Sequence, residues 1–155
     1  MPFTRRSVLS LLSVSALAAC GSRSVTPQVA HRDLNPGETP QMRDLIVKYS
    51  RNLDIPESLL HRVIQRESDY NPSARNGPYY GLMQILPQTA RTMGYQGSPE
   101  GLLDAETNLR YSGKYLRGAW LVADGNEPRA VMWYAKGYYY EAKRKGLLEA
   151  TGLRT

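Results

Sequence analysis

The sequence predicts one mostly helical domain, and three observations support this fold class. Apolar residues recur at helical spacing in several stretches between residues 41 and 155, whereas no alternating strand pattern runs for more than a few residues. Prolines, glycines, Asn and Asp separate these stretches, as they do at helix ends. The one cysteine, Cys20, excludes an intramolecular disulfide and a thiolate metal cluster. A hydrophobic core must therefore stabilise the domain, and a chain of this size buries roughly two-thirds of its unfolded surface.

Helical patterns recur along the domain and are interrupted by a predicted loop over residues 73–81. Asp54 is the expected cap of the second helix, and Asn71-Pro72 ends it, because a residue before proline avoids helical angles. Gly113 lies inside the longest helix, where it costs about 1 kcal/mol against alanine and indicates close approach of another helix. A short hairpin between Tyr79 and Met83 is weakly indicated. The predicted helices cover residues 45–53, 56–69, 86–93, 104–123, 128–136 and 138–145, with a short one starting at Ser98-Pro99.

Residues 1–19 have the composition of an export signal. Two arginines stand near the start, and the apolar run that follows is too short to span a bilayer as a permanent helix. Residues 17–20, Leu-Ala-Ala-Cys, resemble the lipobox of bacterial lipoproteins. This resemblance implies cleavage before Cys20 and its lipidation, and several acyl chains anchor a protein stably. The alternative is a chance cysteine near an ordinary cleavage site.

Residues 20–40 are predicted to be a flexible tether, because they are rich in small and polar residues and lack periodicity. A coil of this length reaches on the order of 25 Å, which suits a domain that works at a distance from a membrane. His31 is expected to be solvated there. Gly21, in place of an aspartate after the cysteine, favours the outer membrane by resemblance to enterobacterial sorting.

Glu67 is the candidate catalytic residue. In a helix over residues 56–69, it continues the apolar face formed by Leu60, Val63 and Ile64. A carboxyl group on such a face loses water, which favours its neutral form, and a proton held near neutral pH is what a general acid needs. The alternatives are a buried structural carboxylate bonded to main-chain N–H groups, and a residue at the helix end that only looks buried from the pattern.

Several other kinds of chemistry lack their motifs. The chain has no Gly-rich phosphate loop, no Gly-x-Ser-x-Gly elbow and no His-Glu-x-x-His, and its acids lack calcium-loop spacing. His61 lies off the apolar face and is expected to be a surface residue.

Removing residues 1–19 takes away two arginines and no acid, so the formal charge falls from +6 to +4. This charge is too small and scattered to indicate nucleic-acid binding. The many tyrosines can stack on sugars and bond their hydroxyls.

The chain resembles the soluble-type lytic transglycosylase domain over roughly residues 41–146. Several motifs in the right order and spacing carry this resemblance. They are Glu67-Ser68, Asn71-Pro72, Gly81-Leu82-Met83-Gln84-Ile85 with Pro87, Asn108-Leu109, Gly113, Tyr115-Leu116, Ala130 and Tyr134.

The resemblance implies an all-α, lysozyme-like fold with a cleft for glycan. It implies cleavage of the β-1,4 bond between N-acetylmuramic acid and N-acetylglucosamine in peptidoglycan, leaving a 1,6-anhydro end, without metal or organic cofactor. The expected domains are a signal peptide (1–19), a lipidated tether (20–40) and a catalytic domain (41–155). We expect a monomer on the periplasmic side of a bacterial membrane.

The resemblance also implies roles for individual residues. Glu67 would act first as acid and then as base, Met83 and Gln84 would line the cleft near the substrate's acetamido group, and Tyr134 would bond Glu67 or the substrate. Tyr79-Tyr80 precede Gly81, where the family commonly has small residues. This departure predicts either a narrower cleft or a stacking platform, with Tyr80 as the candidate substrate-binding residue. The family usually carries Tyr-Asn-Ala-Gly where this chain has Tyr-Ala-Lys-Gly at residues 134–137. Two alternatives stay open, a muramidase on the same fold and a catalytically silent peptidoglycan-binding lipoprotein.

Overall fold

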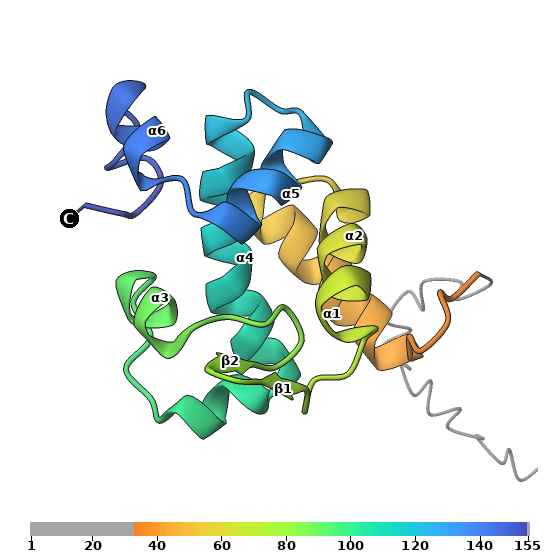
Figure 1. The fold of residues 1–155 in the computed structure, drawn as a ribbon. Helices are drawn as coiled ribbons and strands as arrows, with labels where there is room; N and C mark the ends of the chain where they lie inside the picture. The colour runs from red at the N-terminus through yellow and green to blue at the C-terminus, as the bar shows by residue number, and fades with distance from the viewer. Residues whose placement is uncertain (1–32, 155) are drawn as a thin grey trace, which may run out of the picture.

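A computed structural model describes residues 33–154, which form a helical domain around one long central helix, α4 (Figure 1). The α-helices and strands are α1 (Pro40–Leu53), α2 (Glu57–Ser68), β1 (Arg75–Asn76), β2 (Tyr79–Tyr80), α3 (Pro87–Thr92), α4 (Ala105–Val122), α5 (Glu127–Lys136) and α6 (Tyr139–Arg144). A 3-10 helix, η1 (Pro99–Leu103), precedes α4. The mostly helical fold predicted from the sequence is confirmed.

The central helix α4 holds the other elements in place. It packs against α1, α5, α3 and η1, while α2 packs against α1 and α5. In Figure 1 the hairpin and α3 lie toward one end of α4, and α6 lies toward the other. Gly113 allows α1 to approach, because a Cβ atom at this position would lie 2.5 Å from Leu53 Cδ1. The close helix contact predicted from this glycine is therefore confirmed.

Polar side chains cap three of the helices. Thr39 accepts a hydrogen bond from the main-chain N–H of Met42, Asp104 from that of Thr107, and Asn126 from that of Arg129. Each cap satisfies an N–H group that the helix itself leaves without a partner. The prediction that Asp54 caps α2 is wrong. Asp54 instead ends α1 in a left-handed conformation, and no side chain caps α2.

The hairpin lies upstream of its predicted position. Arg75 pairs with Tyr80 and Asn76 with Tyr79, while a further bridge joins Tyr80 to Ile85. The two-residue loop begins with Gly77 at φ +57°, a conformation that glycine adopts at little cost and that hairpin loops require.

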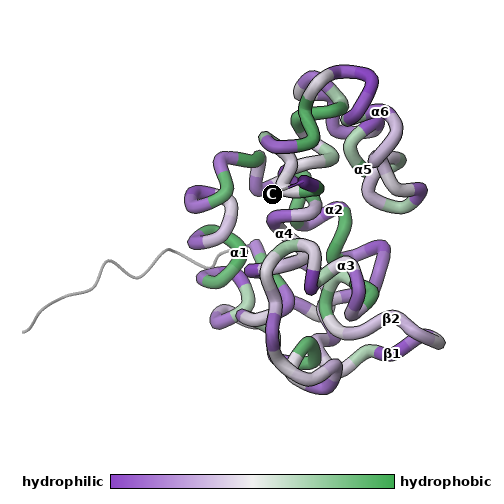
Figure 2. Tube along the Cα trace, turned by 90° about the vertical axis from the view of Figure 1, so that its left-hand side faces the viewer, coloured by the Kyte–Doolittle hydropathy of each residue, from purple (hydrophilic) through white to green (hydrophobic). Residues whose placement is uncertain are grey.

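Apolar side chains gather in two clusters. The larger lies among α1, α2, α4 and α5, and the smaller is formed by Tyr80, Ile85, Ala90 and Leu102. Figure 2 shows hydrophobic and hydrophilic residues alternating along the helices, which is typical of helices that bury one face. The segment after α2 joins the two clusters, and the candidate site lies there.

The folded part begins before the predicted domain boundary at residue 41. Residues 33–39, predicted as part of the tether, are described, and Glu38 is buried with its carboxylate bonded to Arg43. Periodicity gives no sign of this, because the contact depends on one buried ion pair. The predicted signal segment, Cys20 and most of the tether lie outside the described residues.

Candidate active site

Glu67 lies in the last turn of α2. Leu60, Val63 and Ile64 on the same face are buried in the larger core, whereas the Glu67 side chain keeps 24% of its exposure. The carboxyl group therefore sits at the edge of the core. Burial raises the pKa of Glu67, and the positive charge of Arg66, 3.7 Å away, opposes this rise. Glu67 thus combines partial access to solvent with a stabilised neutral form.

The segment after α2 folds back beside Glu67. Ser68 donates a hydrogen bond of 2.7 Å from its hydroxyl to the carbonyl of Leu82. This bond ties the end of the helix to residues 82–84, which supply the next part of the site. Ser68 therefore shapes the chain around Glu67.

Asn108, on α4, holds this segment in place through its side-chain amide. It was not among the site residues predicted from the sequence. Its side-chain oxygen accepts from the main-chain N–H of Met83 at 2.9 Å, and its amide nitrogen donates to the carbonyls of Tyr80 and Leu102. Asn108 is fully buried on α4. An asparagine at a core position of a long helix was the available signal, since a buried amide requires partners.

Gly81 must be glycine for the segment to lie this close to α4. Its φ is +74°, and a Cβ atom there would lie 2.2 Å from the Leu102 carbonyl and 2.4 Å from Asn108 Nδ2. Only a residue without a side chain fits this contact.

Tyr134 on α5 reaches the same segment from the other side. Its hydroxyl donates a hydrogen bond of 2.8 Å to the carbonyl of Met83, and its side chain is largely buried. Burial raises the pKa of Tyr134, and the negative charge of Glu67 adds to this rise. Of the two predicted partners of Tyr134, Glu67 is not its acceptor, because the hydroxyl bonds the Met83 carbonyl. A contact between Tyr134 and the substrate stays a prediction.

Gln84 offers a free acceptor in this region. Its amide nitrogen donates to the carbonyls of Ala74 and Gly81, which fixes the orientation of the amide group. Its buried oxygen Oε1 has no hydrogen-bond partner among residues 33–154. A buried acceptor of this kind is suited to a donor supplied by a ligand.

A cavity of about 310 Å³ opens beside Glu67. It continues into a second one of about 250 Å³, because the two share four lining residues: Tyr79, Gln84, Tyr134 and Ala135. Together they form a groove that runs from Glu67 to Lys136. We call this the Glu67 groove. It is lined by aromatic rings and polar side chains, the surface that sugars bind.

The predicted site residues divide into two groups. Glu67, Gln84 and Tyr134 line the groove. The side chain of Met83 is fully buried in the larger core, so only its main chain serves the site. Tyr80 also points inward, with the Arg75 guanidinium 4.3 Å from its ring centre, and it does not line either cavity. Its neighbour Tyr79, which is 42% exposed, lines both.

The transglycosylase SLT domain family matches residues 44–149. This match covers most of the chain and includes every element that builds the groove. The chain belongs to the transglycosylase SLT domain family.

Two curated relatives match part of this chain and are longer than it. The soluble lytic murein transglycosylase of Escherichia coli strain K12 is 37% identical over 82 residues, 48% of this chain and 13% of that protein. The membrane-bound lytic murein transglycosylase F of Shewanella woodyi is 31% identical over 121 residues, 74% of this chain and 24% of that protein. This chain thus spans at most about a quarter of either relative. No solved structure matches it significantly.

His61 was predicted to be a surface residue, and the structure shows that it is not. Its side chain is 16% exposed, and its Nδ1 atom lies 2.8 Å from the Tyr70 hydroxyl. Helical periodicity placed His61 off the apolar face correctly, but residues upstream of α1 cover that side of α2. His61 therefore lies in a polar network away from the groove.

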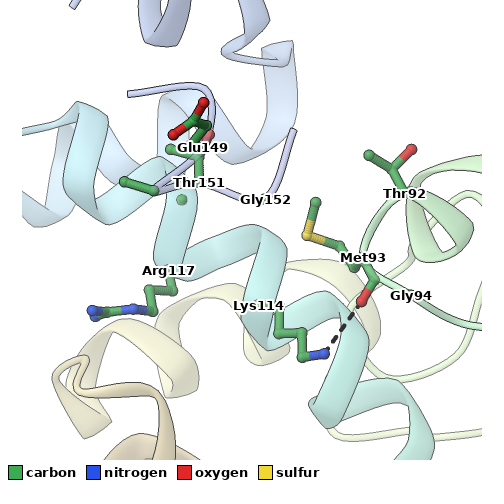
Figure 3. A pocket seen from close by; sticks show the side chains of 10 residues that line it. Thr92, Met93, Gly94, Lys114, Arg117, Glu149, Thr151 and Gly152 are labelled. Carbon is green, nitrogen blue, oxygen red and sulfur yellow. Dashed lines mark hydrogen bonds between the residues drawn. The ribbon is translucent and has the colours of Figure 1, made fainter. Parts of the chain in front are cut away.

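A second hollow of about 380 Å³ lies between α4, the end of α3 and the C-terminal segment (Figure 3). None of the predicted site residues lines it. Lys114 donates to the carbonyl of Met93, and Arg117 donates to that of Leu53. Its two cations thus already have main-chain partners, and Figure 3 shows them pointing in different directions.

Two further features concern residues 33–154 alone. No group of three or more His, Cys, Asp or Glu side chains in this part could hold a metal ion. No helix in it has the length and apolar composition needed to cross a bilayer.

Proposed function

We propose that this chain is a lytic transglycosylase that cleaves the β-1,4 bond between N-acetylmuramic acid and N-acetylglucosamine in peptidoglycan. The observation that carries the proposal is the half-buried carboxyl group of Glu67 at the edge of a groove lined by tyrosines and amides. Membership of the SLT family supports the same reaction. The names of both relatives describe them as lytic murein transglycosylases.

Glu67 acts twice in the proposed mechanism. Its proton passes to the glycosidic oxygen as the bond from that oxygen to the anomeric carbon breaks, and the substrate's acetamido group stabilises the positive sugar. The carboxylate then takes the proton of the C6 hydroxyl as that oxygen bonds to the anomeric carbon. The product carries a 1,6-anhydro ring, Glu67 regains its proton, and no water is consumed.

A single acid–base residue fits the composition of the groove. Two-carboxylate glycosidases place their acids about 5–9.5 Å apart across the scissile bond. Among the described residues that line the Glu67 groove, Glu67 is the one carboxylate. The C6 hydroxyl replaces the second catalytic group, because it attacks from within the substrate.

Gln84 and Tyr79 are proposed to bind the glycan. The unpaired Oε1 atom of Gln84 would accept a hydrogen bond from the sugar's amide or hydroxyl group. The exposed ring of Tyr79 would stack on a pyranose face. Tyr134 would support the site through the Met83 carbonyl.

Digestion of purified sacculi tests the proposal directly. The wild-type chain should release products with anhydro ends, and Glu67→Gln should lower the rate by about 10²-fold or more, the usual contribution of a general acid. Glu149→Gln, on the exposed C-terminal segment, serves as the matched control and should keep full activity. Products heavier by one water would identify a muramidase, and binding without turnover would identify a glycan-binding protein.

We further propose that the chain is exported and attached to a bacterial membrane through lipid on Cys20, with the outer membrane favoured by Gly21. The support is the lipobox-like sequence before Cys20. Fractionation of cells that express the full chain tests it. Wild-type protein should be in the membrane fraction, whereas Cys20→Ser should be soluble after export; equal membrane recovery of both would contradict the anchor.

A further inference from the structure

A short segment upstream of α1 packs against the end of the helix that carries Glu67. We call residues 33–39 the N-terminal strap; they lie outside the family match to residues 44–149. Gly37, at φ +79°, lies so close to the turn after α2 that a Cβ atom would be 2.7 Å from the Asp69 carbonyl oxygen. The strap therefore touches the chain two residues beyond Glu67.

A buried ion pair fastens the strap. The Glu38 side chain is fully buried, and Arg43 at the start of α1 donates to its carboxylate from Nε at 2.6 Å and from Nη2 at 2.7 Å. Asn35 donates to the same carboxylate from its main-chain N–H and its side-chain amide. Burial opposes the charge on Glu38, but the bonds from Arg43 and Asn35 lower its pKa overall. This paired and fully bonded carboxylate fixes the strap on the domain.

A second network joins the strap to the turn after α2. His61 Nδ1 lies 3.3 Å from Asn35 Nδ2 and 2.8 Å from the Tyr70 hydroxyl, while His61 Nε2 lies 3.4 Å from Glu57. Burial, together with the charge of Glu38, raises the pKa of Tyr70 to about 12. Tyr70 therefore stays protonated and hydrogen-bonded at neutral pH.

The turn held by these contacts is strained. Asp69 and Tyr70 are two consecutive non-glycine residues with positive φ angles, +50° and +64°. A bulky residue in this conformation persists only where its surroundings impose it. Tyr70 is almost fully buried against the larger core, and the strap closes the turn from outside.

We propose that the strap is a positioning device for Glu67. By holding Asp69 and Tyr70 in the left-handed turn, it fixes the last turn of α2 and directs the Glu67 carboxyl group into the groove. Gly37, Glu38 and Arg43 are thus positioning residues that touch no substrate. The catalytic consequence rests on the proposed function, in which Glu67 must stay partly buried and well placed over the glycosidic bond.

The test uses the full chain with Gly37→Ala and the milder Arg43→Lys, which keeps the charge but loses the two-pronged hydrogen bond. On soluble peptidoglycan strands we expect kcat to fall about tenfold or more, with KM changed less than twofold, because a small displacement at the reacting groups is costly. Thr151→Val is the matched control. It removes a buried hydroxyl that bonds the Leu147 and Leu148 carbonyls, far from the strap in sequence.

The pH profile separates positioning from a general loss of stability. Arg66 and Tyr134 are the charged or titratable groups that act on Glu67. When the strap is displaced, Glu67 gains water and its pKa falls toward the ordinary value, so the alkaline limb of kcat should move to lower pH. The proposal would be overturned if both strap variants kept the wild-type kcat and the wild-type alkaline limb of its pH profile. It would also be overturned if Thr151→Val showed the same changes as the strap variants.

Hydrogen exchange tests the strap even if no turnover is found. The main-chain N–H groups of Asp69 and Asn71 donate to the carbonyls of Gln65 and Ser68 and so report on the turn. Their protection should fall at least tenfold in Gly37→Ala and stay unchanged in Thr151→Val. Lost protection in an inactive chain would refute the proposed function alone, whereas retained protection would refute the strap.

Discussion

The hydroxyl of Tyr134 donates a hydrogen bond of 2.8 Å to the main-chain carbonyl of Met83, joining α5 to the segment beside Glu67. Both groups are buried, so the bond is shielded from water. Tyr134 itself and Gln84, which follows Met83, line both cavities of the Glu67 groove. The bond thus ties together two segments that line the groove, although its residues lie 51 positions apart in the sequence.

Tyr134→Phe should weaken the domain and the site together. The Met83 carbonyl would be left buried without its partner, at a cost of about 1–3 kcal/mol in the free energy of unfolding. We expect turnover of sacculi to fall as well, because one wall of the groove is released. Urea denaturation and product release measure the two effects.

Tyr49→Phe provides the matched control. It removes a hydroxyl that bonds Glu106 and Arg110, and none of these three residues lines the Glu67 groove. Stability should fall modestly, while turnover measured well below the melting temperature should stay at the wild-type level. Equal losses of turnover in the two variants would show that stability alone explains the effect of Tyr134→Phe.

Asn108→Ala should be among the most destabilising substitutions in the domain. It would remove the bonds that Asn108 makes to the Met83 N–H and the Leu102 carbonyl beneath the groove, while the Tyr80 carbonyl keeps the N–H of Ile85 as a partner. Each buried unpaired group costs about 1–3 kcal/mol, so we expect a loss of about 2–4 kcal/mol after partial relaxation. Ser112→Ala removes one bond to the same asparagine and should lower the free energy of unfolding by about 1 kcal/mol. Urea denaturation of both variants measures the difference. Similar losses in the two would contradict the central role of Asn108.

Glu67→Gln should stabilise the protein near neutral pH. Because burial raises the pKa of Glu67, the folded state holds the proton to higher pH than the unfolded chain does. The contribution of Glu67 to stability is therefore complete below the unfolded pKa, about 4.3, and is lost as pH rises through the folded pKa. Glutamine cannot ionise, so the gain should appear above this window and vanish below it.

Urea denaturation from acid to neutral pH measures this difference between the variant and the wild type. Glu149→Gln controls for the loss of one negative charge at an exposed site and should change stability by less than about 0.5 kcal/mol at every pH. A Glu67→Gln variant less stable than the wild type at neutral pH would show that Glu67 is a structural carboxylate instead.

Lys136 should favour glycans that carry carboxylates. It lines the end of the groove beside Ala135, at the two positions where the chain departs from the usual family sequence, and it is exposed. Lys136→Gln should weaken binding of carboxylate-bearing muramyl strands by up to about fivefold at low salt, since an exposed ion pair contributes about 0.2–1 kcal/mol. Neutral chitooligosaccharides should bind both forms equally.

The matched control for this prediction is Lys143→Gln, an exposed lysine on α6 that lines neither cavity of the groove. Its affinity for both glycans should equal that of the wild type when measured by isothermal titration. If Lys136→Gln lost affinity for the charged and the neutral glycan alike, and at every salt concentration, Lys136 would contribute through packing and not through its charge.

The helical part of the fold could be predicted from the sequence because it depends on local periodicity. The stripe of Leu60, Val63 and Ile64 placed Glu67 on the core side of α2, where it lies. Gly113 indicated a close helix contact, and Gly137 ended α5 at the expected residue. The burial of Glu38 could not be predicted, because the segment around it has no period and its burial depends on a specific ion pair with Arg43 on α1.

The sequence by itself determined the helices, the candidate acid and the order of the motifs, since each depends on residues within a few positions of one another. Only the tertiary structure decided that Tyr79 lines the groove while Tyr80 is buried under Arg75. It also decided that Met83 contributes to the site through its main-chain N–H and carbonyl, which bond Asn108 and Tyr134. The reason is that neighbouring residues of a strand face opposite ways, and contacts between distant segments depend on a register that no local pattern fixes.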